Sequence, residues 1–351
     1  MNCLHPVTIG SLELPGNVFL APVAGYTDRA FRSLCAEQGA FFSFTELISA
    51  EALIRNPRHY GLSGSAATAK HGTPGSPARN TAGAALIGRG TGEKRYGIQL
   101  FGSDPDVLGR ACALLDPLQP DAVDLNAGCP VPKVTKTGAG SALMRDPPRL
   151  GRIVESLARA SREQLRNVPV TVKLRSGWDN SSINYRECAR IAVEAGAAMV
   201  SLHPRTRAQG YGGKSNWACI ADLVSRLPVP VAGSGDLYTP EDARRMFTET
   251  GCAALMFARG AMGNPFIFSE VASFFAAGTW MPPSAEKRLH IALRHLEMLA
   301  EDVGEKKACL EARKQFCACS RGIPGGAALR EKIVYAENIA EYREILHSFM
   351  R

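Results

Sequence analysis

Short apolar segments alternate with segments of helical periodicity along most of the chain. Eight of the apolar segments are rich in β-branched residues and have the length of buried strands. We predict strands at Asn17–Ala21, Phe41–Leu47, Tyr96–Phe101, Ala122–Asn126, Val170–Leu174, Met199–His203, Val229–Ala232 and Ala253–Ala258. We predict helices at Thr27–Gln38, Asp104–Leu115, Leu150–Arg166, Ile183–Ala195, Asn216–Arg226 and Thr239–Thr250, with Thr27 as a candidate cap. Strands that alternate with helices are typical of a parallel sheet.

Eight such units over about 260 residues match the size of a (β/α)8 barrel. A doubly wound sheet is the alternative, but it more often carries phosphate-binding glycines after its first strand. Here the first predicted strand leads into Pro22-Val23-Ala24-Gly25, which is not a GxGxxG motif. We therefore predict an α/β fold: a (β/α)8 TIM barrel followed by an all-α helical domain.

The pattern also suggests where the domains divide. After Pro282-Pro283 the apolar positions follow a helical period to the end of the chain, so we predict a barrel domain at 1–281 and a helical domain at 282–351. Residues 60–95 are rich in Gly and Ala and poor in large apolar residues. Burial in such a segment cannot offset its ordering entropy, so we expect a flexible insertion.

The position of this insertion depends on which flanking segment is the second barrel helix. Ser49–Arg55 has better helix formers than the glycine-broken Thr81–Ile87, and we favour it. The insertion would then leave the barrel on the face opposite the carboxyl ends of the strands.

The charge is positive and concentrated. Lys and Arg total 41 against 33 Asp and Glu, a formal net charge of +8. Seven of the basic residues lie between positions 55 and 95, where Glu93 is the one acid: Arg55, Arg58, Lys70, Arg79, Arg89, Lys94 and Arg95. A basic excess indicates a polyanionic partner, although it can also serve solubility alone.

No apolar run reaches the roughly 18 residues of a membrane span, and no signal-peptide pattern is visible. We therefore expect a cytoplasmic protein without membrane association, with its ten cysteines as thiols. Cys309, Cys317 and Cys319 do not have a usual zinc spacing, so we predict no metal site.

The candidate chemistry lies after the strands, because the loops at the carboxyl ends of barrel strands build the active site. Polar residues and glycines follow almost every predicted strand. Glycines after the seventh and eighth strands would let backbone N–H groups approach a phosphate, and Arg259 could bind it with two hydrogen bonds. Two tight turns with incidental glycines are the alternative.

Five strand-end residues carry further candidate roles. Lys173 could stabilise an anion on a bound ring, or pair with a nearby acid. Gln99 and Asn126 could bind the amide and carbonyl edges of a flat heterocycle. His203 could contact a ligand or a phosphate, or be structural. Cys129 lies in a loop rather than on an apolar face, which makes it a candidate acid or nucleophile.

Seven segments carry a resemblance to a known family. LAPVAGYTDRAFR, QLFG, DLNAGCPVPKVTKTGAGSALM, VTVKLRSGW, HPRTRAQGYGG, GSGD and ARGAMGNPFIF resemble, in order and spacing, the tRNA-dihydrouridine synthases. The resemblance runs from about Val18 to Phe268 and continues more loosely through ARKQF and LREKI, which resemble the family's helical domain, so that residues 282–351 would be a tRNA-binding domain. It implies an FMN-containing oxidoreductase of tRNA processing that reduces a uridine in tRNA to 5,6-dihydrouridine with NADPH, or NADH, as reductant. We expect a monomer.

The resemblance also implies residue roles. Cys129 would protonate C5 of uracil after hydride transfer from flavin N5 to C6, because a thiol with a pKa near 8.5 is mostly protonated at pH 7. The substrate would be bound by Asn126 and Arg205, with the uracil out of its stack. FMN would be bound by Pro22, Val23, Ala24, Gln99, Lys173, His203, Ser234, Gly235, Asp236, Ala258 and Arg259.

Two departures and two alternatives accompany this resemblance. The chain reads HPRT where the family usually has HGRT, and GSGD where it often has GNGD, which weakens the assignment of Ser234. A flavin barrel that reduces a free pyrimidine is one alternative, which the helical domain and the positive charge disfavour. A catalytically inactive RNA-binding protein is the other, which the presence of Cys129 and Lys173 disfavours.

Overall fold

Eight parallel strands close into a barrel in the computed structural model, which describes residues 3–62 and 81–350. The strands are β3 (Val18–Leu20), β4 (Phe42–Phe44), β6 (Tyr96–Phe101), β7 (Ala122–Ala127), β8 (Val170–Arg175), β9 (Met199–His203), β10 (Val231–Ser234) and β11 (Ala254–Phe257). β3 pairs with both β11 and β4, and β4 pairs with β6, so the ring is complete. The predicted TIM barrel is confirmed, each predicted strand overlaps an observed one, and the doubly wound alternative is wrong.

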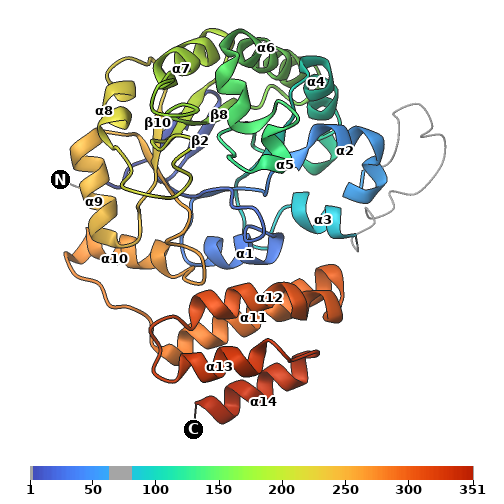
Figure 1. Ribbon diagram of the computed structural model, residues 1–351, viewed down its shortest axis with the longest axis vertical. Coiled ribbons are helices and arrows are strands. Elements are labelled where there is room, and N and C mark those ends of the chain that lie inside the picture. Colours follow the sequence, from blue (N-terminus) through green and yellow to red (C-terminus); the bar gives the residue numbers. More distant parts are fainter. Residues whose placement is uncertain (1–2, 63–80, 351) are drawn as a thin grey trace.

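Helices surround this barrel (Figure 1). They are α1 (Arg29–Glu37), α4 (Pro105–Ala113), α6 (Pro147–Gln164), α7 (Tyr185–Glu194), α8 (Ala218–Val224), α9 (Pro240–Thr250) and α10 (Ile267–Ala277). The six predicted helices are all present, but Asp28 caps α1 in place of Thr27. The Asp28 carboxylate accepts a hydrogen bond from Phe31 N at 2.8 Å, whereas the Thr27 hydroxyl accepts one from Val23 N in the preceding turn.

Shorter elements lie in the connections. They are β5 (Ile48–Ser49), α5 (Pro132–Thr135), η2 (Asp116–Leu118) and η3 (Gly140–Arg145). β5 adds a short parallel pairing to β6, and α5 and η3 follow β7 on the pocket face of the barrel.

A hairpin of β1 (Val7–Ile9) and β2 (Leu12–Leu14) closes the amino-terminal end of the barrel. Its apolar side chains are buried against inward-facing residues of the barrel, among them Phe19, Phe42 and Met199. The sequence shows the alternation of apolar and polar residues that indicates such strands, and Gly10 lies in the turn, but our prediction did not include them.

Two short helices flank the predicted insertion. α2 (Ala50–Arg55) confirms the helix expected at Ser49–Arg55, and η1 (Pro57–Tyr60) follows it. Residues 63–80, half of the insertion, lie outside the described residues. The flexibility and the exit face that we expected for the insertion therefore stay predictions.

The segment after the insertion corrects one expectation. Thr81–Ile87, which we took as the poorer helix, also forms one, α3 (Ala82–Ile87), capped by the hydroxyl of Thr81. Its glycine is needed for packing: a Cβ at Gly83 would lie 2.5 Å from the carbonyl oxygen of His59. Close packing on η1 therefore outweighs the low helix propensity of glycine.

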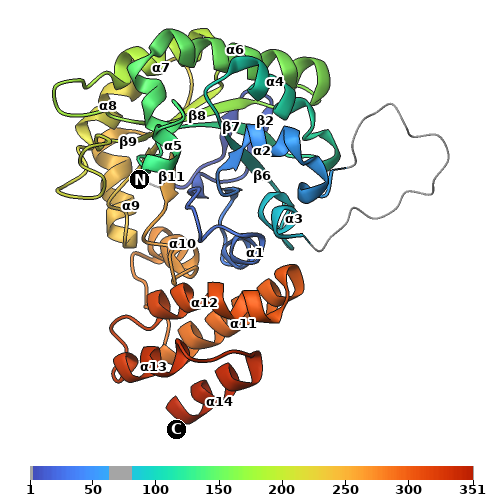
Figure 2. The same cartoon turned by 45° about the vertical axis from the view of Figure 1, so that its right-hand side comes forward.

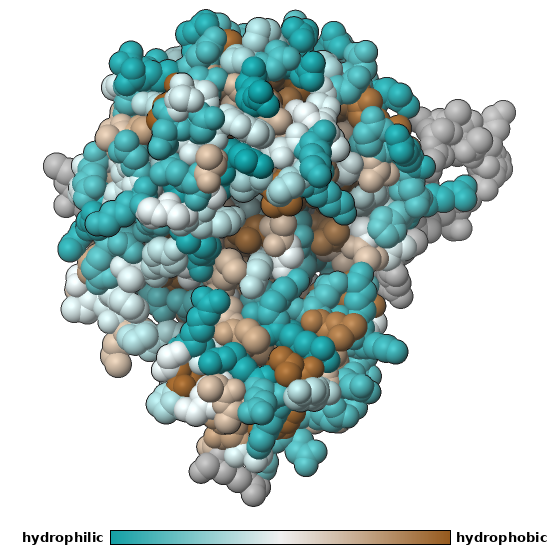
Figure 3. All heavy atoms as spheres, viewed as in Figure 1, coloured by the Kyte–Doolittle hydropathy of each residue, from teal (hydrophilic) through white to brown (hydrophobic). Residues whose placement is uncertain are grey.

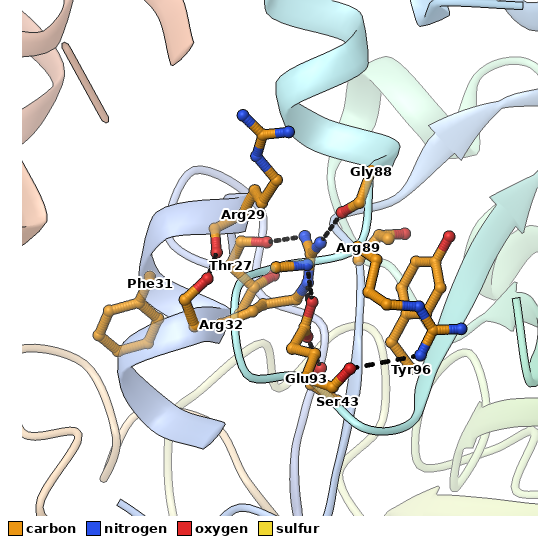
Figure 4. A network of polar contacts seen from close by, with 12 residues as sticks. Thr27, Arg29, Phe31, Arg32, Ser43, Gly88, Arg89, Glu93 and Tyr96 are labelled. Carbon is orange, nitrogen blue, oxygen red and sulfur yellow. Dashed lines mark hydrogen bonds and ion pairs between the residues drawn. The ribbon is translucent and has the colours of Figure 1, made fainter. Parts of the chain in front are cut away.

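A buried arginine ties this segment to α1 (Figure 4). The Arg32 side chain is fully buried and forms an ion pair with Glu93 at 3.1 Å. It also donates hydrogen bonds to the carbonyl oxygens of Thr27, Leu86 and Gly88. Because a buried cation is costly unless it is paired, this network fixes the chain between α3 and β6 against α1.

The helical domain consists of α11 (Ala285–Val303), α12 (Glu305–Cys319), α13 (Gly326–Ile333) and α14 (Ile339–Phe349), which share a hydrophobic core. The domain boundary that we predict at 281/282 lies in the connection between α10 and α11. Among the described helices, none is both long and apolar enough to span a bilayer.

The helical domain packs beside α1 and α10 (Figures 1 and 2). Polar contacts join it to α1: His295 lies 3.0 Å from Asp28, Arg294 lies 2.9 Å from Glu37, and Arg29 pairs with Asp302. The domain is therefore held at the side of the barrel where β3 ends.

Candidate active site

The carboxyl ends of the strands surround a pocket of about 360 Å³. Figure 3 shows this face of the molecule hollowed between the barrel and the helical domain, with apolar residues in the hollow. Of the predicted site residues, twelve line the pocket: Pro22, Val23, Ala24, Asn126, Cys129, Lys173, His203, Ser234, Gly235, Asp236, Ala258 and Arg259. Gln99 and Arg205 are buried behind its wall, because each is engaged with other side chains.

The wall formed by β6, β7 and β8 contains a chain of side-chain hydrogen bonds. Asn126 Nδ2 donates to Gln99 Oε1 at 2.7 Å, and Gln99 Nε2 donates to Asp124 Oδ2 at 2.7 Å. Thr171 Oγ1 donates to the other oxygen of Asp124 at 2.5 Å. At the near end, Asn126 Oδ1 accepts from Cys129 N at 2.9 Å. The network therefore sets the orientation of Asn126 and the start of the Cys129 loop.

Burial dominates the titration of this wall. It raises the pKa of Asp124 to about 7, against the hydrogen bonds from Thr171 and Gln99 and the charge of Lys173. Burial and the nearby Arg175 lower the pKa of Lys173 to about 8, although Asp124 and Cys129 oppose the change. Near neutral pH, Lys173 is a cation and Asp124 is close to its midpoint.

Cys129 is half-buried at the pocket surface. Burial raises the pKa of its thiol, against the Val131 N–H and the charges of Arg175 and Lys173. The loop is held from below, because the carbonyl oxygen of Cys129 accepts hydrogen bonds from Ser141 N and Ser141 Oγ, both at 3.0 Å. The structure thus presents a protonated thiol in a fixed loop.

The wall formed by β9, β10 and β11 is ionic. Asp236 accepts hydrogen bonds from Arg205 Nη2 at 2.8 Å, Ser215 N at 2.8 Å and Arg259 Nη2 at 3.0 Å. Burial acts to raise the pKa of Asp236, but these donors outweigh it and hold the pKa below its usual value. The carboxylate therefore holds Arg259 at the pocket and Arg205 behind the wall.

Arg205 serves this wall from behind. It is 1% exposed, and its guanidinium also donates to the carbonyl oxygens of Gly212 and Gly213. Four hydrogen bonds within the protein occupy the guanidinium, so the structure places Arg205 as a support for Asp236 and the β9–α8 loop.

His203 is a neutral ring on the same wall. Burial, together with the charges of Lys173, Arg175, Arg205 and Arg259, lowers its pKa to about 2. Its Nε2 lies 3.3 Å from Arg205 Nη1. Because arginine can only donate, Nε2 must accept, and the ring hydrogen is on Nδ1.

Gly235 gives this wall its open backbone. A Cβ there would lie 2.6 Å from the ring of His203, and the backbone has φ +102°. Only glycine combines that conformation with that contact, and Gly235 lines the pocket with its backbone alone.

Tyr211, Tyr238 and Arg175 also belong to the site, but sequence reasoning gave them no role. Arg259 lies between two tyrosines of the pocket rim, 4.9 Å from the ring centre of Tyr211 and 5.3 Å from that of Tyr238. Their loops carry no periodic signal that could have placed them. Arg175 donates from Nε to Gly128 O at 2.9 Å and so braces the Cys129 loop. It lies two residues after Lys173 on β8, and alternation along a strand would have predicted the shared face.

Glu46 is a further missed residue, at the end of the second barrel strand. Its Oε2 accepts from Gly25 N at 2.7 Å, in the loop that contributes Pro22, Val23 and Ala24 to the pocket. Burial raises its pKa to about 7, with Asp28 adding to this and Lys314 of the helical domain opposing it.

The described part of the chain contains no disulfide and no group of three or more His, Cys, Asp or Glu residues arranged to hold a metal ion. The reactive side chains that line the pocket are a thiol, a lysine and arginines beside Asp236.

Two solved structures show a similar fold. The chain is similar to an old yellow enzyme homologue from Zymomonas mobilis, with TM-score 0.50 and 13% identity over 81% of this chain and 95% of that one. It is also similar to histamine dehydrogenase from Rhizobium sp. 4-9, with TM-score 0.53 and 14% identity over 84% of this chain and 50% of that one. At these identities the likeness shows the fold alone.

Sequence comparison is more specific. The "Probable tRNA-dihydrouridine synthase" of Treponema pallidum is 46% identical over 347 residues, 97% of this chain and 95% of the relative. The "tRNA-dihydrouridine synthase B" of Xanthomonas axonopodis is 34% identical over 330 residues, 94% of this chain and 91% of the relative. The family model for dihydrouridine synthase matches residues 19–350. The chain therefore belongs to the dihydrouridine synthase family.

Proposed function

We propose that this protein is an FMN-dependent oxidoreductase that reduces a uridine of tRNA to 5,6-dihydrouridine, with NADPH or NADH as reductant. One observation carries the proposal: the pocket holds a protonated thiol, Cys129, on one wall and the arginine-paired Asp236 on the other. The relatives of the chain are named for this reaction. We further propose that it acts as a monomer in the cytoplasm, where its substrate is found.

The pocket residues fit a flavin mononucleotide. The backbone of Gly235 and the guanidinium of Arg259 suit its phosphate, and the carboxylate of Asp236 is already neutralised by arginines. Ser234 would contribute its backbone, because its hydroxyl donates to Met256 O at 3.1 Å. Pro22, Val23, Ala24 and Ala258 would line the flavin, and His203 would face it.

When bound, the flavin would supply the hydride that is added to C6 of uracil. Lys173 would place its positive charge beside the isoalloxazine ring and so stabilise the negative charge of the reduced form. Gln99 would act behind Asn126 by fixing the orientation of that amide. One hydrogen of Asn126 Nδ2 is left for a carbonyl oxygen of the uracil.

Cys129 would complete the reduction by giving its proton to C5, so that one hydride and one proton are added across the C5–C6 double bond. The raised pKa keeps the proton on sulfur until it is needed. The thiolate left behind would accept a hydrogen bond from the N–H of Val131 and lie near Lys173 and Arg175. We assign Arg205 to the support of Asp236 instead of to the substrate.

The test uses the purified protein and, as substrate, tRNA isolated from a strain whose tRNA contains no dihydrouridine. We expect a flavin absorption band near 450 nm in the protein and NADPH-dependent formation of dihydrouridine in the tRNA. Reduction of free uracil without reduction of tRNA would support the alternative of a small-pyrimidine reductase. A colourless protein that binds tRNA without reducing it would support the inactive RNA-binding alternative.

A further inference from the structure

A group of basic side chains lies beside the pocket, in the connection from β7 into the first turn of α6 and in the loop after β9. We call it the basic strip and define it by Lys133, Lys136, Arg145, Arg149 and Arg207. We propose that the basic strip binds the phosphate backbone of the RNA substrate, so that the RNA is held across the pocket between the strip and the helical domain. The inference rests on the proposed function and names a surface for that substrate.

The order of the strands places the basic strip across the pocket from the helical domain. Around the barrel the order is β3, β4, β6, β7, β8, β9, β10 and β11. The helical domain meets the neighbours β3 and β11: Asp28 follows β3 and contacts His295, and Gly263 follows β11 and lines a small gap with Cys319. β7 and β8 each lie three strands from one of these neighbours and four from the other, on the far side of the ring. Figure 1 shows α5 on the pocket face and α12 beside the barrel.

The basic strip is continuous with the reacting loop. α5, which carries Lys133, begins three residues after Cys129, and η3, which ends at Arg145, packs under the same loop. Ser141 of η3 donates both hydrogen bonds to the Cys129 carbonyl oxygen. A nucleotide next to the one that enters the pocket would therefore meet the basic strip first.

An aromatic side chain positions two of the arginines. The guanidinium of Arg145 lies 5.0 Å from the ring centre of Trp178, and that of Arg207 lies 4.6 Å from it. Backbone hydrogen bonds from Arg207 N to Gly177 O and from Ala208 N to Trp178 O, both at 2.9 Å, hold the two loops together. Trp178 thus fixes two cations from different loops before any ligand arrives, which lowers the entropic cost of binding an anion.

The cations of the basic strip are available. Within the described residues, no carboxylate lies within 4.0 Å of the charged groups of Lys133, Lys136, Arg145 or Arg207. Nε of Arg207 is buried without a hydrogen-bond partner. Arg149 is the exception, since it pairs with Asp146 at 3.2 Å.

The shape of the surface also suits phosphate. Lys136, Arg145 and Arg149 line a shallow hollow of about 400 Å³, with Asp146 as its one acid. The carboxylate of Asp179, the nearest acid on the Trp178 loop, accepts hydrogen bonds from Ser181 and Ser182 instead of from the strip. Phosphate contacts of this kind hold a nucleic acid in register without reading its sequence.

The experiment compares two double variants in tRNA binding over a series of salt concentrations. Lys136→Gln with Arg145→Gln removes two charges from the basic strip. Arg159→Gln with Arg162→Gln removes two charges from the far half of α6 and is the matched control. We expect the strip variant to bind tRNA at least tenfold more weakly at low salt and to lower the slope of log K against log salt by about 1.5, the value for two lost phosphate contacts.

A third variant separates positioning from net charge. Trp178→Leu keeps every cation but removes the ring that holds Arg145 and Arg207, and we expect it to weaken tRNA binding severalfold. Flavin content and the rate of NADPH oxidation without RNA should stay at the wild-type level in all three variants, which shows that the pocket is intact.

The outcomes distinguish this inference from the proposed function. If the wild-type protein neither binds tRNA nor forms dihydrouridine, the proposed function fails and the inference fails with it. If the wild-type protein does both while the strip variant keeps its affinity and salt slope, the basic strip alone is refuted. Equal loss in the strip and control variants would mean that net charge, not this surface, binds the RNA, and it would also overturn the inference.

Discussion

Two carboxyl groups of the barrel have pKa values that are shifted in opposite directions. Asp124 lies on the wall formed by β6, β7 and β8, and Asp236 lies on the wall formed by β9, β10 and β11. Burial raises the pKa of Asp124 to about 7, since its hydrogen bonds come from a neutral amide and a hydroxyl. Asp236 is also partly buried, but two arginines and a backbone N–H keep its pKa below the usual value.

The difference shows how one barrel can offer two electrostatic environments a few strands apart. The first wall presents a protonated thiol and two cations, Lys173 and Arg175. On the second wall Asp236 pairs with Arg205 and Arg259 and offsets the repulsion between them. Substitutions on each wall test this difference.

The largest effect is expected at Cys129. Cys129→Ala should keep the flavin and lose turnover by roughly 10²-fold or more, the usual contribution of a general acid. Cys129→Ser should fall by a similar factor, because a hydroxyl is a far weaker acid than a thiol. The measurement is dihydrouridine formation at saturating tRNA, with the visible spectrum as the control for flavin content. Full activity of the alanine variant would remove the thiol from the reaction.

The next effect is expected on the ionic wall. Arg259→Ala should weaken flavin binding by about 1.5–3 kcal/mol, the range for a hydrogen bond to a charged group. It also removes one partner of Asp236, so the loss should be greater than that of Arg245→Ala, an exposed arginine on α9 outside the pocket. Titration of the apoprotein with FMN measures both constants. Tight, stoichiometric flavin in the Arg259 variant would contradict the phosphate assignment.

A smaller effect is expected from Asp124→Asn, which keeps the shape of the hydrogen-bond network and removes its charge. Asp124 raises the pKa of Lys173, so its loss should lower that pKa further below about 8. The cation is then lost at a lower pH. The variant should therefore be severalfold less active than the wild-type protein near pH 8 and much closer to it near pH 6.5. Parallel pH profiles would show that Lys173 does not set the alkaline limit.

The two walls were not equally open to sequence reasoning. The strand pattern placed Asn126, Lys173, His203 and Arg259 at one edge of the barrel, because the carboxyl ends of parallel strands meet there. It could not show that Arg205 turns behind the wall, since that depends on carbonyl oxygens presented by the 212–213 turn.

The burial of Gln99 and the packing of α3 were also beyond prediction from the local sequence. Gln99 is completely buried because register pairs it with Asp124 on β7, a contact between residues 25 positions apart. α3 forms despite Gly83 because η1 packs closely against it. Local propensity and spacing carry the fold and most of the pocket, whereas the burial of Gln99 and Arg205 and the formation of α3 depend on which distant groups meet.

The smallest effect on turnover, and a separate one on stability, is expected at Glu46, on the side of the pocket that faces the helical domain. Its pKa is raised from 4.5 to about 7, so folding favours the protonated form. The stability that this contributes is complete below about pH 4.5 and is lost as the pH rises through about 7.

Glu46→Gln keeps an acceptor for Gly25 N and removes the titration. The variant should match the wild-type protein at pH 4.5 and exceed it at pH 8 by up to about 3 kcal/mol in unfolding free energy. Urea unfolding at the two pH values measures this, with Glu301→Gln on the exposed face of α11 as the control. The slope due to Asp124 should persist in all three proteins, and a Glu46 variant that is less stable at pH 8 would mean that the ionised carboxylate is favoured beside Lys314.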